Sequence, residues 1–214
     1  YSHSTADHKR RLFALGEAPI PRFVGRESEP EDLERFQCLF ARHEGAVTAP
    51  TAGLHFSREM LKRMEIKGIE AAFITLHCGL GNFRNTDVED LTKHKMDSEQ
   101  MFVDAECCRI VNKAKDEERN VLAVGTTVQR ALETACSADM RIKEFEGWTN
   151  KFIFPPYDFC VANSMLSNFH LPYSTLLMLT TAFGGYEQTM HAYEEALKED
   201  YRFGPFGDVM LIID

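Results

Sequence analysis

The chain has 214 residues, a formal net charge of −9 and 44% hydrophobic content, enough for one large domain, or one and a half small ones, with a buried core. An acidic chain does not indicate nucleic-acid binding by its total charge, although a local basic face can coexist with it. No apolar run approaches the roughly 18 residues that span a membrane. The six cysteines form no C-x-x-C pair, and the first residues lack the apolar centre of a signal peptide, so we expect reduced thiols in a cytoplasmic protein.

The first part of the chain is predicted to be irregular. Residues 1–30 show little periodicity, residues 14–30 contain several Pro, Gly and Ser breaks, and the first 25 or so look like the tail of a different structural unit. The chain also lacks an initiator Met, as a fragment or a processed product would. Residues 30–42 are then expected to form a helix, with Pro30 near its first position and acids in its first turn.

Strands and helices are expected to alternate through the rest of the chain. Expected helices cover residues 57–67, 103–119, 126–136, 174–183 and 186–199, the last two separated by two glycines. Expected strands cover residues 45–50, 69–76, 120–125, 151–154, 161–166 and 209–213. This alternation is typical of an α/β fold with a largely parallel sheet.

Four motifs stand where an apolar run breaks into Gly, Pro, Thr, His or Asn, as buried strands do before functional loops. They are APTAGLHF (Ala49–Phe56), ITLHCGLGNF (Ile74–Phe83), AVGTTVQR (Ala123–Arg130) and SNFHLPYSTLLML (Ser167–Leu179). Three of them carry a His at or near the break. Their recurrence predicts one shared pocket.

The first two motifs offer histidines and glycines. Thr51 and His55 are the polar groups of the first, although His55 in a tight turn is equally compatible with a packing role. His77 ends a buried strand, at the edge where α/β sheets place ligands. Gly79 and Gly81 follow it and would let a ligand approach the backbone closely.

The last two motifs place hydroxyls at helix starts. Thr126 and Thr127 follow a strand and a glycine, which favours a cradle for an anion or a ribose, and Arg130 one turn later is suited to a carboxylate or phosphate. The alternative is that Thr126 or Thr127 caps the helix.

In the fourth motif, Asn168 and His170 precede a helix that starts at Ser174 and Thr175. His170 is therefore a candidate ligand contact.

Other sites are not predicted. His94, Asp97 and Glu99 are close in sequence, but their spacing matches no zinc pattern, so we expect no metal. The chain has no G-x-S-x-G elbow, which leaves a hydrolase triad unsupported. The charges at Lys62, Arg63, Arg141 and Lys143 are interpreted as ordinary solvated side chains.

Taken together, these motifs resemble the S-adenosylmethionine:tRNA ribosyltransferase-isomerases of queuosine biosynthesis. The likeness runs from about Leu15 to Asp214 and includes LGEAPIPRFV, KHKMDSE, FIFPPYDF and the closing YRFGPFGD. It implies an α/β domain, barrel-like or with a mostly parallel sheet flanked by helices. Residues 1–20 would be the end of an inserted β-barrel domain, and residues 21–214 the catalytic domain without its N-terminal part.

The resemblance also implies an activity. The family transfers the ribosyl part of S-adenosylmethionine to 7-aminomethyl-7-deazaguanine in the tRNA anticodon and isomerises it, which gives epoxyqueuosine and releases adenine and methionine. S-adenosylmethionine would be a co-substrate, with no prosthetic group, and tRNA a partner. The implied acid–base or ribose-binding residues are His55, His77 and His170. The implied substrate-binding residues are Thr51, Gly79, Gly81, Thr126, Thr127, Arg130, Asn168, Ser174 and Thr175.

Several positions depart from the family pattern. Asp97 stands where the family usually has a second His, Val128 and Gln129 replace Ser-Val, and Pro156 replaces Gly. The family's proteins are also longer, and roughly their first two-fifths has no counterpart here. The alternative hypothesis is therefore a diverged, non-catalytic homologue that binds tRNA or a nucleoside.

Overall fold

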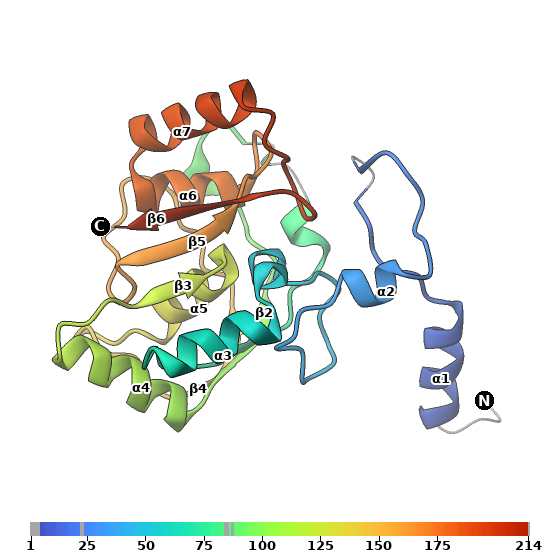
Figure 1. The fold of residues 1–214 in the computed structure, drawn as a ribbon, viewed down its shortest axis with the longest axis horizontal. Coiled ribbons are helices and arrows are strands. Elements are labelled where there is room, and N and C mark those ends of the chain that lie inside the picture. The colour runs from blue at the N-terminus through green and yellow to red at the C-terminus, as the bar shows by residue number, and fades with distance from the viewer. Residues whose placement is uncertain (1–4, 22–23, 84–85, 87, 214) are drawn as a thin grey trace. The chain divides into compact units, whose positions relative to one another are not determined.

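The computed structural model describes residues 5–21, 24–83, 86 and 88–213 (Figure 1). Two compact units, Tyr1–Gln37 and Cys38–Asp214, make up the chain. Helix α1 (Thr5–Leu15) lies in the first unit, so the prediction of an irregular start is wrong over these residues. The sequence TADHKRRLFAL contains no Gly or Pro and is rich in helix-forming residues.

The origin of the first twenty residues stays a prediction. Residues 1–4 of the proposed β-barrel remnant lie outside the described residues, and α1 occupies most of the remainder. The predicted domain boundary near residue 20 likewise stays a prediction.

The helix expected over residues 30–42 is much shorter than predicted. Helix α2 (Asp32–Arg35) ends after one turn. Asp32 and Phe36 are buried one helical turn apart while Leu33 is exposed, but Cys38 is buried only two residues further on, which does not suit a continuing helix. The buried Asp32 accepts hydrogen bonds from both Nη atoms of Arg26, and this pairing is the main reason that its pKa is lowered to about 2.

The second unit contains two three-stranded sheets. The first has the order β1-β2-β4 and is antiparallel throughout, with Thr75 opposite Phe102 and Gln100 opposite Trp148. The second has the order β3-β5-β6, with β3 and β5 parallel and β5 and β6 antiparallel. The strand bounds are β1 Thr75–Leu76, β2 Glu99–Val103, β3 Leu122–Val124, β4 Phe145–Thr149, β5 Ser164–Asn168 and β6 Val209–Ile213.

The fold is thus mixed α/β, but the expected barrel-like or mostly parallel sheet is wrong. Among the described strand pairs, only β3 and β5 run parallel. The alternation of strands and helices identifies elements, but it does not say which strands become neighbours or in which direction they pair. Strands β2 and β4 were not predicted, because Glu99, Gln100 and Gly147 interrupt their apolar pattern.

The helices of the second unit agree better with the sequence. They are α3 (Arg58–Ile66), α4 (Ala105–Asp116), α5 (Thr126–Ala135), α6 (Thr175–Gly184) and α7 (Tyr186–Lys198). Ser57 caps α3 by accepting a hydrogen bond from the Met60 N–H, as predicted, and Gly68 follows its end with φ +76°. The described chain contains no helix that is both long and apolar enough to cross a membrane.

Helix α5 is packed between the two sheets. It contacts β1 and β4 of the first sheet, β3 and β5 of the second, and also α6. The core around it includes the fully buried side chains of Met101, Ile142, Ile153 and Met165. Contacts with both sheets therefore fix the position of helix α5.

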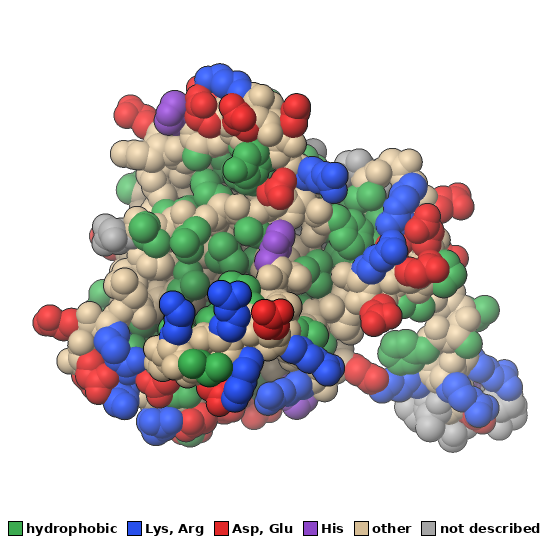
Figure 2. Space-filling model, viewed as in Figure 1, with side chains coloured by type: hydrophobic (Ala, Val, Ile, Leu, Met, Phe, Trp, Pro, Cys, Tyr) green, Lys and Arg blue, Asp and Glu red, His purple; other side chains and the backbone are tan. Residues whose placement is uncertain are grey.

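The second sheet keeps an apolar face toward the surface. Leu122 of β3 and Leu211 and Ile213 of β6 are exposed there, and Figure 2 shows hydrophobic side chains gathered over these strands. The opposite face carries the buried Ala123 and Met165. Both faces are thus apolar, which is why these runs predict buried strands.

Several expected strands are absent or shortened among the described residues, and the strand expected over residues 120–125 is one of them, since β3 covers only Leu122–Val124. Residues 45–50 and 151–154 form no strand, and the strand expected over residues 69–76 is reduced to β1. The exposed Phe73 packs on the ring of Phe40 instead of entering a sheet. Apolar runs alone cannot separate a strand from an extended loop with local contacts.

Candidate functional site

The N-terminus of α5 is the point where the motifs meet. Gly125 is its N-cap residue with φ +99°, and no side chain caps the helix. The alternative that Thr126 or Thr127 caps it is therefore wrong. The Gly125 N–H donates to the Leu166 carbonyl at 2.8 Å, which ties the turn to β5. The first amides of α5 remain suited to an anion.

The first and fourth motifs are hydrogen-bonded to each other. The 3₁₀ helix η2 (Thr51–His55) carries Thr51, whose Oγ1 donates to Oδ1 of Asn168 at 2.8 Å. Asn168 ends β5, is buried and also donates to the carbonyls of Gly207 and Asp208 at 3.4 Å. These two predicted site residues therefore join η2, β5 and the turn before β6.

His55 is exposed, but its ring orientation is fixed. Its Nε2 lies 3.1 Å from the carbonyl oxygen of Gly207. A carbonyl only accepts hydrogen bonds, so Nε2 carries the proton and, in the neutral ring, Nδ1 is an acceptor. This arrangement is suited to taking up a proton at Nδ1, and it gives His55 a defined tautomer that the sequence could not predict.

His77 lies just beyond β1 and is half-buried. Its backbone N–H donates to the Gln100 carbonyl at 2.9 Å, and its ring packs edge-on against Phe102. The Gly45 backbone is so close that an added Cβ would lie 2.6 Å from Nδ1 of His77. This Nδ1 is buried without a hydrogen-bond partner among the described residues.

A buried ion pair links the second and third motifs. Arg130 of α5 pairs with Glu99 at the start of β2, and each is only 4% exposed. The other oxygen of Glu99 accepts the Gly79 N–H at 3.0 Å. Burial lowers the pKa of Arg130. Arg130 thus holds a carboxylate, as its pattern suggests, but this carboxylate belongs to the protein, and a substrate contact stays a prediction.

Glu99 is the residue that the sequence did not identify as part of the site. It lies in a polar segment, and nothing in its spacing indicates that it is buried beside Arg130. Asp97 of the same segment lies against the glycine loop, since a Cβ added to Gly81 would be 2.7 Å from its Oδ2. Residues 97–99 therefore support the Gly79–Gly81 turn from one side.

His170 is in a different state from the other two histidines. Its backbone N–H donates to the Tyr193 hydroxyl at 2.9 Å, and its Nε2 lies 2.8 Å from Oγ of Ser167. Burial lowers the pKa of the His170 ring to about 4. The ring is consequently neutral at pH 7 and is a weak base, but it can hold or orient a polar group.

A small cavity lies between the starts of α5 and α6. Its lining includes Thr126, Thr127, Arg130, Lys151 and Thr175, and its volume is about 10 Å³, room for about one water-sized group. The third and fourth motifs therefore share a cavity. Of the predicted site residues, Thr51, His55, His77, Gly79, Gly81, Asn168, His170 and Ser174 do not line it.

Ser174 has a local structural role. Its Oγ accepts the Leu177 N–H at 3.1 Å and donates to the Leu171 carbonyl, which makes it the N-cap of α6. Its neighbour Thr175 faces the cavity instead. Of these two adjacent residues, Ser174 therefore caps the helix and Thr175 lines the cavity.

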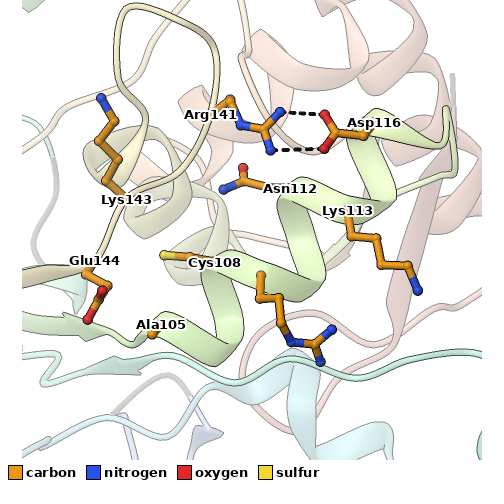
Figure 3. A pocket seen from close by; sticks show the side chains of 9 residues that line it. Ala105, Cys108, Asn112, Lys113, Asp116, Arg141, Lys143 and Glu144 are labelled. Carbon is orange, nitrogen blue, oxygen red and sulfur yellow. Dashed lines mark hydrogen bonds and ion pairs between the residues drawn. The ribbon is translucent and has the colours of Figure 1, made fainter.

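A larger hollow on the surface lies along α4 (Figure 3). It measures about 740 Å³, and Arg141 on its wall forms a two-pronged ion pair with Asp116. Arg109 pairs with Glu106. Arg141 and Lys143 are exposed, as predicted. Their charges are compensated by neighbouring acids, so this hollow does not stand out as an anion site.

A metal centre also has no support. Within the described ranges, His, Cys, Asp and Glu form no group of three or more that could hold a metal ion.

Comparison with known proteins connects this geometry to a family. Residues 2–212 match the family model described as queuosine biosynthesis protein. The chain belongs to this family. A relative from Phocaeicola vulgatus is 69% identical over 214 residues, which are 100% of this chain and 61% of the relative. One from Bacteroides fragilis is 68% identical over 97% of this chain and 59% of its own length. Both are named S-adenosylmethionine:tRNA ribosyltransferase-isomerase.

A solved structure in the family has a similar fold. The crystal structure of S-adenosylmethionine tRNA ribosyltransferase from Thermotoga maritima is 38% identical, with a TM-score of 0.63 over 76% of this chain and 51% of that chain. This chain spans about three-fifths of the length of the curated relatives that it matches. The family is thereby established for most of the chain described above.

We predict that the Glu99–Arg130 pair stabilises the fold. Arg130→Met leaves a buried carboxylate without its partner, so the free energy of unfolding should fall by about 3–5 kcal/mol. The double variant Glu99→Gln/Arg130→Met removes that charge and keeps an acceptor for the Gly79 N–H, so it should recover at least half of the loss. Urea unfolding measures both.

The exposed pair Arg141–Asp116 is the matched control. Arg141→Met should cost less than about 1 kcal/mol. If Arg130→Met costs no more than this, or if the double variant is no better than the single one, the buried pair does not have the stabilising role that its burial implies.

We also predict that His170 makes the free energy of unfolding sensitive to acid. Between pH 6.5 and 4 the unfolded state binds the imidazole proton and the folded state does not, so the free energy of unfolding should fall as the pH is lowered through this window. The loss approaches about 3 kcal/mol, or about 1.4 per pKa unit. His170→Asn should show a shallower pH dependence by that amount in urea titrations at pH 7 and pH 4.

The exposed His191 on α7 gives the control, since His191→Asn should retain the wild-type pH dependence. Equal slopes for wild type and His170→Asn would mean that His170 is not held neutral by the fold.

Proposed function

We propose that this chain is part of an S-adenosylmethionine:tRNA ribosyltransferase-isomerase. The enzyme would transfer the ribosyl group of S-adenosylmethionine to 7-aminomethyl-7-deazaguanine in the tRNA anticodon and isomerise it, yielding epoxyqueuosine, adenine and methionine. The observation that carries this proposal is the 69% identity, over the whole chain, to a relative that bears this name. S-adenosylmethionine is then a co-substrate, and tRNA is the macromolecular partner.

The reaction needs a base beside the sulfonium, an acid at the departing adenine and groups that hold the ribose and the methionine. We propose His55 and His77 as the acid–base residues. Nδ1 of His55 is left as an acceptor by the Gly207 contact, and Nδ1 of His77 has no partner among the described residues. His170, with its low pKa, is proposed to orient a polar group while neutral.

The substrate-binding proposals divide between two regions. Thr51 and Asn168 hold η2 against β5, next to His55, while Gly79 and Gly81 form the turn beyond His77. The remaining proposed contacts flank the starts of α5 and α6: Thr126, Thr127, Arg130, Ser174 and Thr175. The two regions meet where Ala52 approaches Gly125, since a Cβ on Gly125 would lie 3.8 Å from that of Ala52.

A non-catalytic homologue that binds tRNA or a nucleoside is the second hypothesis. Asp97, where the family usually has a His, motivates it. The relatives at 65–69% identity are named S-adenosylmethionine:tRNA ribosyltransferase-isomerase, which favours catalysis over binding alone.

Adenine release tests the activity directly. The full-length gene product should release adenine from S-adenosylmethionine only when the tRNA carries 7-aminomethyl-7-deazaguanine, because the amine is the acceptor; chromatography measures the adenine. tRNA with an unmodified guanine is the control. A folded protein that binds tRNA but releases no adenine would contradict the transferase proposal and support the binding hypothesis.

The histidines can be separated by substitution. His77→Ala should abolish adenine release, because it removes a proposed proton-transfer group, and should lower the Tm by only a few degrees, because His77 lies just outside a strand and is half-buried. His191→Ala, on the exposed face of α7, should leave both unchanged. A large loss of Tm in His77→Ala would instead assign the ring a packing role against Phe102 and Gly45.

A further inference from the structure

We propose that the cavity between the starts of α5 and α6 binds the carboxylate of the methionine part of S-adenosylmethionine. This inference rests on the proposed function and deepens it, because it assigns one chemical group of the co-substrate to one set of atoms. Three independent features support it: two helix N-termini, unpartnered buried polar groups, and the positive charge of the lining together with the small volume of the cavity.

The two helix N-termini supply oriented dipoles. Helix α5 has ten residues and begins at Thr126 without a side-chain cap. Helix α6 also has ten residues and begins at Thr175, with the Ser174 hydroxyl occupied by the Leu177 N–H. Thr126 and Thr175 both line the cavity. Partial positive charge from two helices therefore meets in one place, where an anion is stabilised.

Buried polar groups at the same place lack partners. Oγ1 of Thr175 is fully enclosed, in a residue only 6% exposed, and has no hydrogen-bond partner among the described residues. Nε of Arg130 is also enclosed and has no hydrogen-bond partner among the described residues, and Arg130 as a whole is 4% exposed. An unsatisfied buried donor costs about 1–3 kcal/mol, and such groups are rare unless something binds them. A carboxylate oxygen in the cavity would supply an acceptor.

The charge of the lining favours a single negative charge. The charged residues among those lining the cavity are Arg130 and Lys151. Glu99 already neutralises Arg130 from the side of β2, whereas Nζ of Lys151 donates to the uncharged Tyr157 hydroxyl at 3.1 Å. Glu133, which accepts from Tyr157, does not line the cavity. A monoanion therefore balances the site better than a dianionic phosphate does.

Size points in the same direction. A volume of about 10 Å³ has room for about one small polar group. One oxygen of a terminal carboxylate fits this space, and the rest of the group would lie outside it. A backbone phosphate of tRNA is tetrahedral and continues into a sugar on both sides, so it fits this space poorly. The tRNA would accordingly contact another part of the protein.

Paired ligands and paired variants test the assignment. Binding of S-adenosylmethionine and of decarboxylated S-adenosylmethionine, which lacks only the carboxylate, would be measured by calorimetry with the full-length gene product. tRNA with an unmodified guanine would be present, so that no turnover occurs. Thr175→Val removes the hydroxyl at nearly constant volume, and Thr175→Ser is the matched control that keeps it. Thermal unfolding verifies that each variant is folded.

The expected result is that Thr175→Val weakens binding of S-adenosylmethionine about tenfold or more, as the loss of a hydrogen bond to a charged group does. Its affinity for the decarboxylated ligand should match that of the wild type, and Thr175→Ser should retain both affinities. Equal weakening of both ligands, or of neither, would overturn the carboxylate assignment. Failure of the wild type to bind either ligand would instead contradict the proposed function and, with it, this inference.

Discussion

The arrangement of the candidate site depends on the buried pair between Glu99 and Arg130. Glu99 is on the first sheet and also holds the Gly79 N–H, while Arg130 is on the helix packed between the two sheets. One carboxylate therefore fixes the position of the glycine turn relative to α5. Because a buried charge without its partner is costly, these segments cannot separate without a large loss of stability. The pair thus fixes the position of the second motif relative to the third.

The three histidines have the same side chain, but the fold places each of them in a different environment. His55 is exposed and has its tautomer set by a carbonyl, His77 is half-buried with one nitrogen unpartnered, and His170 is kept neutral by burial. A proton-transfer reaction requires groups with different proton affinities. The fold places the three rings at different depths, and at His170 burial lowers the pKa of the ring.

The helices of the second unit follow from the sequence because their signals are local. Ser57 caps a helix at the position that the sequence predicts, and glycines separate α6 from α7. The sheets do not follow, since strand neighbours lie far apart in the chain. β5 pairs with β3 in one direction and with β6 in the other, and no pattern within β5 specifies either choice. Helix α1 does not stand out in the sequence because the Pro, Gly and Ser residues of the segment 14–30 follow it directly.

By itself, the sequence determined which residue types would be concentrated near the site, and its ordered motifs were sufficient to indicate the family. Thr126, Thr127, Arg130 and Thr175 were found from local patterns, and they line one cavity. Only the tertiary structure decided that Glu99 faces Arg130, that Ser174 serves as a cap while Thr175 lines the cavity, and that the sheets are largely antiparallel. Propensity, capping and turn chemistry act over a few neighbouring residues, whereas burial, charge pairing and strand direction depend on segments brought together from distant parts of the chain.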